Sequence, residues 1–261
     1  MDTSCVVTGA ARGIGRGIAE RMVARGHRVV ITDIDADAVR RTAAKIGAAA
    51  GLTQDVRDPA SHHEVAVEAA RHGRLVAWFN NAGVGDDGFL AELSEEQVRR
   101  LVEVNILGVM WGSRAALEAF GPEGGDIVNT GSLSAHGPVP GLSVYAATKA
   151  AVVSLTTSLV AETTRNVRVH ALCPDGVDTQ LVADMSDTGM AKALVHSGGQ
   201  LMSVDDAADA AVALVGSRRV VRTVPAWRGG LMRFTSLTPS VSSAGFGAFA
   251  VLGRRVMRRS G

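Results

Sequence analysis

The types and spacing of Ser132, Tyr145 and Lys149 suit proton transfer between a side chain and a small molecule. Tyr145 is the only tyrosine in the chain, and Lys149 follows it by four residues. On an α-helix this spacing is about one turn, so the phenol and the ammonium would lie on the same face. A cation beside a phenol favours the phenolate and lowers its pKa. The stretch from Asn129 to Lys149 therefore predicts an acid/base site.

Alternating strands and helices must position this stretch. Apolar runs predict strands at residues 3–8, 28–33, 49–54, 75–79, 125–131, 168–173 and 220–227. Periodicity and caps predict helices from Ile14, at 36–47, 60–72 and 95–119, through Tyr145 to about Arg165, and from Val204. This order indicates an α/β fold, a Rossmann-type doubly wound parallel sheet flanked by helices, in a single domain over residues 1–228. Residues 229–261 form a tail expected to pack on that domain or on a partner, and residues 178–201 suggest a mobile flap.

Composition narrows the class of protein. The 27 basic and 26 acidic side chains nearly cancel, which argues against a nucleic-acid surface. Cys5 and Cys173 lie in apolar runs, so we expect free thiols in a reducing compartment. The first strand begins within a few residues of Met1, which leaves no room for a signal peptide, and no apolar run reaches the ~18 residues of a membrane span. We therefore expect a soluble cytoplasmic protein.

A glycine-rich turn follows the first predicted strand, where Thr8, Gly9, Gly13 and Gly15 form the pattern TGxxxGxG. Glycines let the backbone turn sharply and approach a pyrophosphate, whose charge the next helix N-terminus stabilises. Tight strand–helix turns also use glycine where no ligand binds. The position directly after the first strand, with Asp33 closing the second, favours a dinucleotide site.

Asp33 bears on the choice of cofactor. A carboxylate there can accept hydrogen bonds from the ribose hydroxyls of NAD and would repel the 2′-phosphate of NADP. Unit charges about 4 Å apart at an effective dielectric of ~20 interact by about 4 kcal/mol. Arg12 is the counterweight, since it could reach a 2′-phosphate or simply stay in solvent. We predict NAD in preference to NADP.

Together these motifs resemble the short-chain dehydrogenase/reductase family, over residues 4 to about 225. The resemblance implies an adenine contact at Asp55–Val56, a segment NNAG at 80–83 along the cofactor, and a loop after Cys173 that holds the nicotinamide. The cofactor residues it implies are Gly9, Arg12, Gly13, Ile14, Gly15, Asp33, Asp55, Val56, Asn81, Ala82, Gly83, Tyr145, Lys149, Pro174, Val177 and Thr179. The catalytic residues it implies are Asn105, Ser132, Tyr145 and Lys149.

The resemblance also implies a role for each catalytic residue. Tyr145 would exchange a proton with an alcohol or a carbonyl while hydride passes to or from the nicotinamide. Lys149, helped by the positive oxidised nicotinamide, would lower the pKa of Tyr145 by about three units and hold the nicotinamide ribose. Ser132 would hydrogen-bond the substrate oxygen. The main chain of Asn105, at an interruption of its helix, would hold a water linking Lys149 to solvent.

Two features depart from the family pattern. Asp175 follows Pro174 where the family usually has glycine. We expect its carboxylate to point to solvent, the alternative being an altered loop or a contact with a polar substrate. The tail after Trp227 is also longer than a compact core needs.

The predicted substrate end of the site is mainly apolar. Substrate contacts are assigned to Ser132, Ser134, Leu142 and Tyr145, with further walls at Val84, Phe89, Leu133 and Val139 and a lid at residues 180–202. These walls favour a hydrophobic alcohol or ketone over a sugar. His136 could line the pocket, but it receives no role because a loop histidine is usually exposed. No metal site is predicted, because His62 and His63 have no acid or cysteine at ligand spacing.

The tail and one helix suggest partners. In the tail, an apolar patch at 244–252 precedes Arg254, Arg255, Arg258 and Arg259. One interpretation is an interfacial membrane anchor, but we favour a helix that covers the pocket or packs on a neighbouring subunit. The helix that carries Tyr145 is apolar on several faces, so we expect a homodimer or homotetramer.

The sequence thus predicts an NAD-dependent oxidoreductase that acts on a small molecule, a secondary alcohol or the matching ketone. The alternatives are an NADPH-dependent carbonyl or 3-oxoacyl-thioester reductase and a dinucleotide-sensing scaffold without turnover. Asp33 argues against the first. A scaffold would not need Ser132, Tyr145 and Lys149 all intact, which argues against the second.

Overall fold

The computed structural model describes residues 2–237 and 239–260, with all side chains except those of 239–246, 259 and 260. Within these residues a parallel sheet of seven strands has the order β3-β2-β1-β4-β5-β6-β7. The strands are β1 (Thr3–Thr8), β2 (Arg28–Asp33), β3 (Ala50–Thr53), β4 (Arg74–Asn80), β5 (Gly125–Thr130), β6 (Val167–Pro174) and β7 (Val221–Val224). The predicted doubly wound parallel sheet in a single domain is confirmed.

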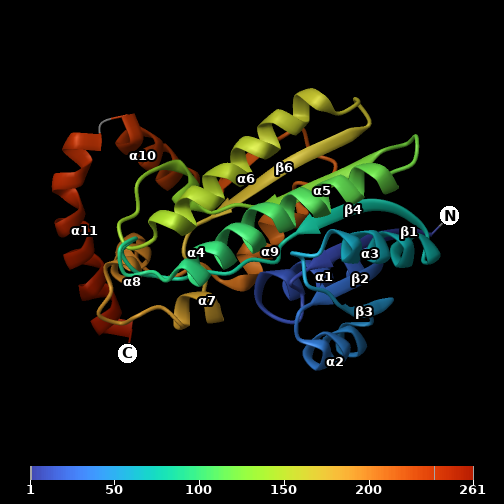
Figure 1. Ribbon diagram of the computed structural model, residues 1–261, viewed down its shortest axis with the longest axis horizontal. Helices are drawn as coiled ribbons and strands as arrows, with labels where there is room; N and C mark the ends of the chain where they lie inside the picture. The colour runs from blue at the N-terminus through green and yellow to red at the C-terminus, as the bar shows by residue number, and fades with distance from the viewer. Residues whose placement is uncertain (1, 238, 261) are drawn as a thin grey trace.

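Helices cover both faces of the sheet (Figure 1). One face packs against α1 (Gly13–Ala24), α2 (Ala36–Ile46) and α9 (Val204–Val212), and the other against α3 (Pro59–Arg71), α5 (Gly108–Ala119) and α6 (Ser143–Glu162). Successive side chains of β1 explain the two layers, since Cys5 and Val7 join the first core and Val6 joins the second. All three are fully buried, as expected for a strand covered on both faces.

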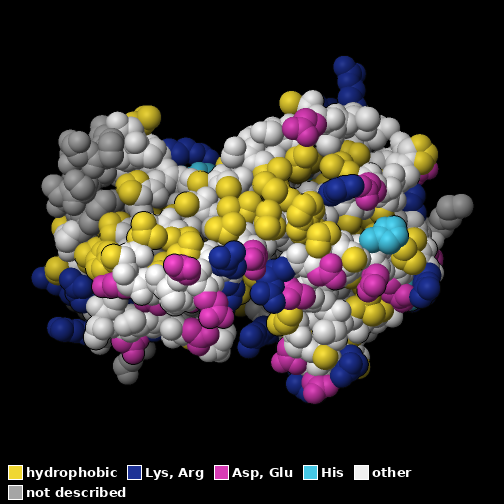
Figure 2. Space-filling view, in the orientation of Figure 1, with side chains coloured by type: hydrophobic (Ala, Val, Ile, Leu, Met, Phe, Trp, Pro, Cys, Tyr) yellow, Lys and Arg dark blue, Asp and Glu magenta, His cyan; other side chains and the backbone are white. Residues whose placement is uncertain are grey.

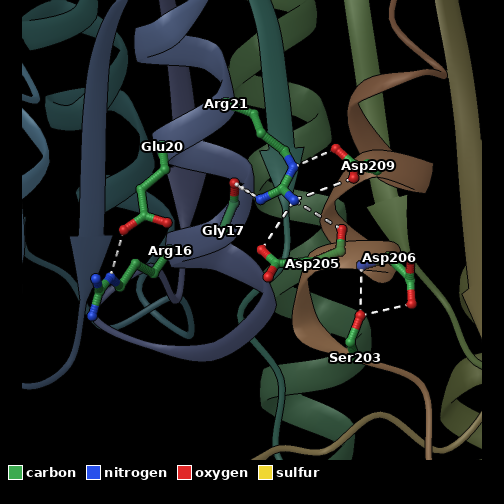
Figure 3. A network of polar contacts seen from close by, with 8 residues as sticks. All are labelled: Arg16, Gly17, Glu20, Arg21, Ser203, Asp205, Asp206 and Asp209. Carbon is green, nitrogen blue, oxygen red and sulfur yellow. Dashed lines mark hydrogen bonds and ion pairs between the residues drawn. The ribbon is translucent and has the colours of Figure 1, made fainter.

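The α1 helix packs against α9 within one of the two helical layers. Gly17 allows the close approach, because a Cβ there would lie 3.0 Å from the Ala208 side chain. Arg21 of α1 forms ion pairs with Asp205 and Asp209 of α9 (Figure 3). The same figure shows Ser203 capping α9 by accepting a hydrogen bond from the Asp206 N–H, as predicted for this helix start. The packing at Gly17 and the ion pairs of Arg21 thus fix α1, the helix that begins at the glycine-rich turn.

The predicted helix at 95–119 is interrupted. It consists of α4 (Glu95–Val102), a π-helical turn at Glu103–Leu107, and α5. Ser94 caps α4 in a capping box with Gln97, as its position predicted. The extra residue of a π-turn leaves the regular hydrogen-bond ladder, which agrees with the expected helix interruption at Asn105.

The α6 helix lies against the sheet with its N-terminal end at the carboxyl ends of the strands. It contacts β5, β6, α4 and the π-turn. Among the described helices, only α6 is long and apolar enough to cross a membrane, with a mean hydropathy of 1.4. The sequence did not indicate this, because it contains no unbroken apolar run of that length. The packing of α6 on the sheet is that of a core helix, and apolar core helices pass the same test.

The C-terminal part differs most from the sequence prediction. The expected flap at 178–201 contains α7 (Gln180–Ala183), α8 (Met190–Val195) and a 3-10 turn at His196–Gly198. The last strand ends at Val224, where its pairing with β6 ends, and α10 (Ala226–Leu237) starts two residues later across the predicted boundary at 228. Then α11 (Pro239–Ser260) packs on α8. Figure 1 shows α10 and α11 at the end of the molecule away from the N-terminus.

Candidate active site

The turn between β1 and α1 is built for close backbone approach. Gly9 and Gly13 have φ angles of 63° and 57°, a left-handed region that favours glycine. A Cβ on Gly9 would lie 2.6 Å from the Cα of Ala82, so the loop after β4 packs directly on the turn. No side chain caps the N-terminus of α1, and this leaves its N–H groups available to an anion.

The segment after β4 holds this turn in place. Thr8 Oγ1 accepts hydrogen bonds from the N–H groups of Asn81 and Ala82, both at 3.1 Å. The Asn81 amide donates to the carbonyl oxygens of Thr8 and Gly9, both at 3.0 Å. Gly15 lies beneath, where a Cβ would collide with the Gly9 carbonyl and the Asn81 amide. Its glycine is thus required by packing under the turn.

A cavity of about 840 Å³ extends from this turn to the ends of β4, β5 and β6. The described residues that line it include every predicted cofactor residue except Gly15: Gly9, Arg12, Gly13, Ile14, Asp33, Asp55, Val56, Asn81, Ala82, Gly83, Tyr145, Lys149, Pro174, Val177 and Thr179. Segments up to 240 residues apart in the sequence, from Gly9 to Phe249, therefore border one space. Its volume falls in the range of ligand sites in proteins.

Both residues expected to influence the cofactor lie at one end of the cavity. The Asp33 carboxylate, at the end of β2, accepts hydrogen bonds from the N–H groups of Ala11 at 3.1 Å and Asp35 at 3.2 Å. These bonds fix the acid beside the glycine turn. Arg12 is exposed and also lines the cavity. The arrangement presents a fixed negative group and a solvated positive group to the same region.

The end of β3 brings in an arginine that the sequence analysis missed. Arg57 Nη2 lies 2.6 Å from Asp55 Oδ2, and its hydrogen bonds hold the pKa of Asp55 below the ordinary value. Arg57 also lines the cavity. The adjacent Val56 is nearly buried, and its carbonyl oxygen contacts His62 Nε2 at 2.9 Å. An arginine two residues after the acid was the only signal in the sequence.

Ser132, Tyr145 and Lys149 form one wall of the cavity. Lys149 Nζ lies 5.6 Å from the centre of the Tyr145 ring and donates a hydrogen bond to the Thr130 carbonyl at 2.9 Å. Ser132 Oγ accepts a hydrogen bond from the Ser134 N–H at 3.2 Å and is also hydrogen-bonded to Tyr145. The predicted pairing of phenol and ammonium on one helix face is present, with the serine hydroxyl beside the phenol.

The pKa values of this pair run against the expectation of a phenol near neutrality. Burial raises the pKa of Tyr145 to about 12, and the hydrogen bond with Ser132 opposes that rise only in part. Burial lowers the pKa of Lys149 to about 8. Desolvation therefore dominates the pKa of Tyr145, and a phenol with a pKa of about 12 is protonated at neutral pH.

Asn105 ties the catalytic helix to the segment after β4. It is fully buried, and its Oδ1 accepts from the Val84 N–H at 2.9 Å while its Nδ2 donates to the Val84 carbonyl at 2.9 Å. Nδ2 also donates to Thr148 Oγ1 at 3.2 Å. Its side chain thus aligns the residue before Lys149 with the chain after Gly83. The water bridge through its main chain stays a prediction.

The expectation for Asp175 is wrong. Its Oδ2 lies 2.6 Å from Arg228 Nη1 of α10, and the two side chains are only 15% and 11% exposed. Burial raises the pKa of Asp175, although Arg228 opposes the rise. Arg228 also donates a hydrogen bond to Ser197 Oγ at 3.2 Å. The carboxylate avoids solvent because β7 and α10 carry an arginine over the loop, a contact between positions 53 residues apart.

The substrate end of the cavity is lined mainly by apolar side chains, together with a few polar ones. Val84, Leu133, Val139 and Leu142 line it as predicted, together with Ser132, Ser134 and Tyr145. Ser134 Oγ is buried with no hydrogen-bond partner among the described residues. Phe89 is 49% exposed and is not among the described lining residues, so that part of the prediction is wrong. The Phe89 N–H donates a hydrogen bond to the Glu92 carboxylate in a local turn, and the Phe89 ring faces outward.

The remaining walls come from segments after residue 180. The apolar ones are Leu181, Val182, Met185, Leu194, Val195, Leu231, Met232 and Phe249. The first five of these lie in the predicted lid at 180–202, whereas Leu231, Met232 and Phe249 follow no motif. His136, expected to be exposed, is 9% exposed and lies 2.9 Å from Thr223 Oγ1, and it is not among the described residues that line the cavity. Burial, with the charge of Arg233, lowers the pKa of His136 to about 4.

Comparisons with known proteins agree with this geometry. The sequence profile described as short chain dehydrogenase matches residues 3–190. A sorbitol dehydrogenase of Cereibacter sphaeroides is 39% identical over 180 residues, which cover 67% of this chain and 70% of that protein. A 3-oxoacyl-(acyl-carrier-protein) reductase of Salmonella typhimurium is 32% identical over 210 residues, covering 78% of this chain and 86% of that protein.

A solved structure extends the likeness to most of the fold. A short chain dehydrogenase/reductase from Burkholderia phymatum, in complex with NAD, superposes with a TM-score of 0.82. It is 28% identical, and the match covers 92% of this chain and 95% of that one. The matched profile contains both the turn at Gly9 and the wall at Tyr145 and Lys149. The family profile and the likeness in fold both include residues that line the cavity. This chain therefore belongs to the short chain dehydrogenase family.

Proposed function

We propose that this chain is an NAD-dependent oxidoreductase that interconverts a hydrophobic secondary alcohol and its ketone, with Tyr145 as general acid/base. One observation carries the proposal. Ser132, Tyr145 and Lys149 lie on one wall of a cavity whose far end holds the glycine turn and Asp33. A proton-transfer group and a dinucleotide cradle are thus open to the same small molecule.

The chain's own residues fit a dinucleotide. Gly9 and Gly13 hold the turn in a left-handed backbone, and the N-terminus of α1 offers uncapped N–H groups to a pyrophosphate. Asp33 offers carboxylate oxygens to ribose hydroxyls at the end of β2. Pro174, Val177 and Thr179 also line the cavity, and the resemblance to the family implies that they hold the nicotinamide. When bound, the nicotinamide supplies the hydride chemistry.

The protein's part in the reaction is to move one proton and to hold one oxygen. The Ser132 hydroxyl, whose oxygen accepts the Ser134 N–H, has its own proton left to donate to the substrate oxygen. Tyr145 gives its phenolic proton to the ketone oxygen in reduction and takes the alcohol proton in oxidation. Lys149 stabilises the phenolate formed in the first case. Because burial raises the pKa of Tyr145 to about 12, alcohol oxidation should need the positive charge of the oxidised cofactor.

The cofactor preference rests on Asp33. Its position, fixed by the Ala11 N–H, supports a ribose diol and disfavours a phosphate group. A second candidate function is an NADPH-dependent carbonyl or 3-oxoacyl-thioester reductase. Arg12 favours it, because this exposed side chain lines the same end of the cavity. We rank it second because the acid is held in place and no hydrogen bond of Arg12 is seen among the described residues.

Assembly and location complete the proposal. Val102, Met110 and Val160 are 36%, 37% and 41% exposed on α4, α5 and α6. Figure 2 shows hydrophobic side chains gathered over α5 and α6. We propose that this face joins subunits of a homodimer or homotetramer. Both cysteines are free and buried, which supports a place in the cytoplasm.

A substrate screen with matched variants tests the proposed activity. The purified chain is given NAD with aliphatic, aromatic and sterol secondary alcohols, and reduced nicotinamide is followed by absorbance. Tyr145→Phe should lose roughly 100- to 10,000-fold in kcat while the Kd for NAD, measured by calorimetry, stays within about twofold. Ser158→Ala, on the exposed side of the same helix, is the control.

Two outcomes would contradict the proposal. Turnover by Tyr145→Phe near the parent rate would remove Tyr145 as the acid/base. NAD binding without turnover of any alcohol or ketone would favour a dinucleotide-sensing scaffold instead. A lower KM with NADP than with NAD would favour the second candidate.

A further inference from the structure

The outward face of α10 carries a stripe of large apolar side chains. Trp227, Leu231, Phe234 and Leu237 recur at intervals of four and three residues, which places them along one side of the helix. Their exposed fractions are 64%, 41%, 64% and 79%. Four large apolar side chains along one side of a helix are seldom all this exposed, and contiguous apolar surface of this kind marks an interaction site.

The opposite face of α10 explains why the stripe points outward. Gly229 is buried against Thr223, where a Cβ would lie 2.7 Å from the threonine methyl group. Arg228 is held by Asp175, and the main chain at Met232 lies against Gly137. These contacts fix the rotation of the helix about its axis. The apolar stripe is therefore a fixed surface feature.

The C-terminal part of the sequence, which includes α10 and α11, carries charge of one sign. Residues 210–261 contain nine arginines and no aspartate or glutamate, whereas the residues before them hold 18 basic and 26 acidic side chains. Arg254, Arg255 and Arg258 are exposed on α11, and Figure 2 shows basic side chains along the C-terminal part of that helix. The two C-terminal helices thus combine exposed aromatic rings with exposed arginines, whereas Arg228 is paired with Asp175.

The stripe also borders the cavity. Leu231 is exposed on α10 and lines the cavity, and Met232, Thr235 and Phe249 of the two helices line it as well. Leu231 therefore belongs both to the exposed stripe and to the lining of the cavity.

We propose that α10 and α11 form a peripheral docking surface for an anionic lipid bilayer. Trp227, Phe234 and Leu237 would enter the headgroup boundary, where indole and phenyl rings are favoured. Arg254, Arg255 and Arg258 would contact lipid phosphates. The chain lies on the bilayer and does not span it. This proposal concerns binding alone and holds whichever cofactor or substrate the site uses.

Vesicle flotation with the full chain tests the proposal. The probes are vesicles of phosphatidylcholine alone and of phosphatidylcholine mixed with phosphatidylglycerol. The parent should float with the mixed vesicles, and added salt should weaken this binding. Replacing Arg254, Arg255 and Arg258 by glutamine should weaken binding to mixed vesicles by about 100-fold, from the loss of three surface charges. The double variant Trp227→Ser with Phe234→Ser should abolish flotation with both vesicle types.

The matched control is the double variant Phe89→Ser with Leu90→Ser, because these residues are 49% and 62% exposed on a loop outside α10 and α11. It should float as the parent does. Far-UV circular dichroism and thermal unfolding check that each variant is folded. A second readout is tryptophan fluorescence, since of the three tryptophans Trp78 is fully buried, Trp111 is half-buried and Trp227 is 64% exposed. Mixed vesicles should shift the emission to the blue in the parent but not in Trp227→Phe.

Three outcomes would overturn the proposal. The first is absence of parent binding to mixed vesicles at low salt. The second is flotation of the Trp227→Ser, Phe234→Ser variant at the parent level. The third is a parent oligomer that this variant splits while neither protein floats, because the stripe would then cover a second copy of the chain.

Discussion

The two ends of the cavity are built in different ways. At the cofactor end the protein offers mainly backbone, with Gly9 packed on Ala82 and the Asn81 amide bonded to the turn. At the substrate end it offers apolar side chains from α7, α8, α10 and α11, linked to the sheet by a few polar contacts such as Asp175–Arg228. Backbone contact restricts residue type closely, whereas an apolar wall accepts many residue types.

This difference explains why the family match ends where it does. The profile covers residues 3–190, which include the cofactor turn and the catalytic wall. The helices α10 and α11 lie beyond it, in a part of the chain that from residue 210 onward contains nine arginines and no acid. The family profile therefore covers the cofactor end and the catalytic wall, and the likeness in fold, which covers 92% of this chain, reaches beyond it.

The largest expected effect tests the cofactor end. Asp33→Asn keeps an oxygen for the Ala11 N–H but removes the negative charge. Loss of a repulsion of about 4 kcal/mol, reduced by solvent, should lower the ratio of kcat/KM for NAD over NADP by roughly 100-fold. Asp35→Asn removes a charge two residues away, at the exposed cap of α2, and should leave the ratio unchanged. An unchanged ratio in Asp33→Asn would contradict the assignment.

The second prediction tests the link between the substrate cover and the sheet. Arg228→Met leaves the Asp175 carboxylate buried and unpaired, which should cost about 3 kcal/mol in urea unfolding. Adding Asp175→Asn should restore more than half of that loss. Arg40→Met breaks the exposed pair with Asp37 and should cost under about 0.5 kcal/mol. Strictly additive losses in the double variant would show that the pair is not coupled.

The third prediction isolates close backbone contact from backbone conformation. Gly9 and Gly47 have φ angles of 63° and 71°, but a Cβ on Gly9 meets Ala82 and a Cβ on Gly47 meets nothing within 4 Å. Gly47→Ala should cost about 1 kcal/mol, and Gly9→Ala about 3 kcal/mol, in denaturant unfolding. Gly9→Ala should also weaken NAD binding. Equal costs would mean that the contact with Ala82 carries no strain.

The smallest expected effect concerns acid stability at the substrate end. The pKa of His136 is about 4 in the folded chain, below the ordinary 6.5, so the unfolded chain binds more protons between these values. Stability is therefore lost as the pH falls through this window, by about 2 kcal/mol between pH 7.5 and 5. His136→Gln should remove most of that loss in urea unfolding at the two pH values. A pH dependence identical to that of the parent would contradict this origin.

Local patterns were sufficient for most of the fold and for the cofactor end. Strand β1 ends at Thr8 as expected, and the Tyr145–Lys149 spacing places both groups on one face of α6. Such features depend on neighbours in the sequence, through strand alternation, helix caps and the φ angles that glycine allows. The expectations for Asp175, Phe89 and His136 failed because their surroundings come from α10, a local turn and β7 respectively.

The sequence by itself determined the parallel α/β fold, the turn that approaches a dinucleotide and the helix face that pairs Tyr145 with Lys149. These rest on backbone geometry and on residues within about one turn of each other. Only the tertiary structure decided that Tyr145 is held protonated by burial, that Asp175 meets Arg228, and that α10 turns an apolar stripe outward. Burial and contacts over long sequence distances arise when the chain packs, so no local pattern encodes them.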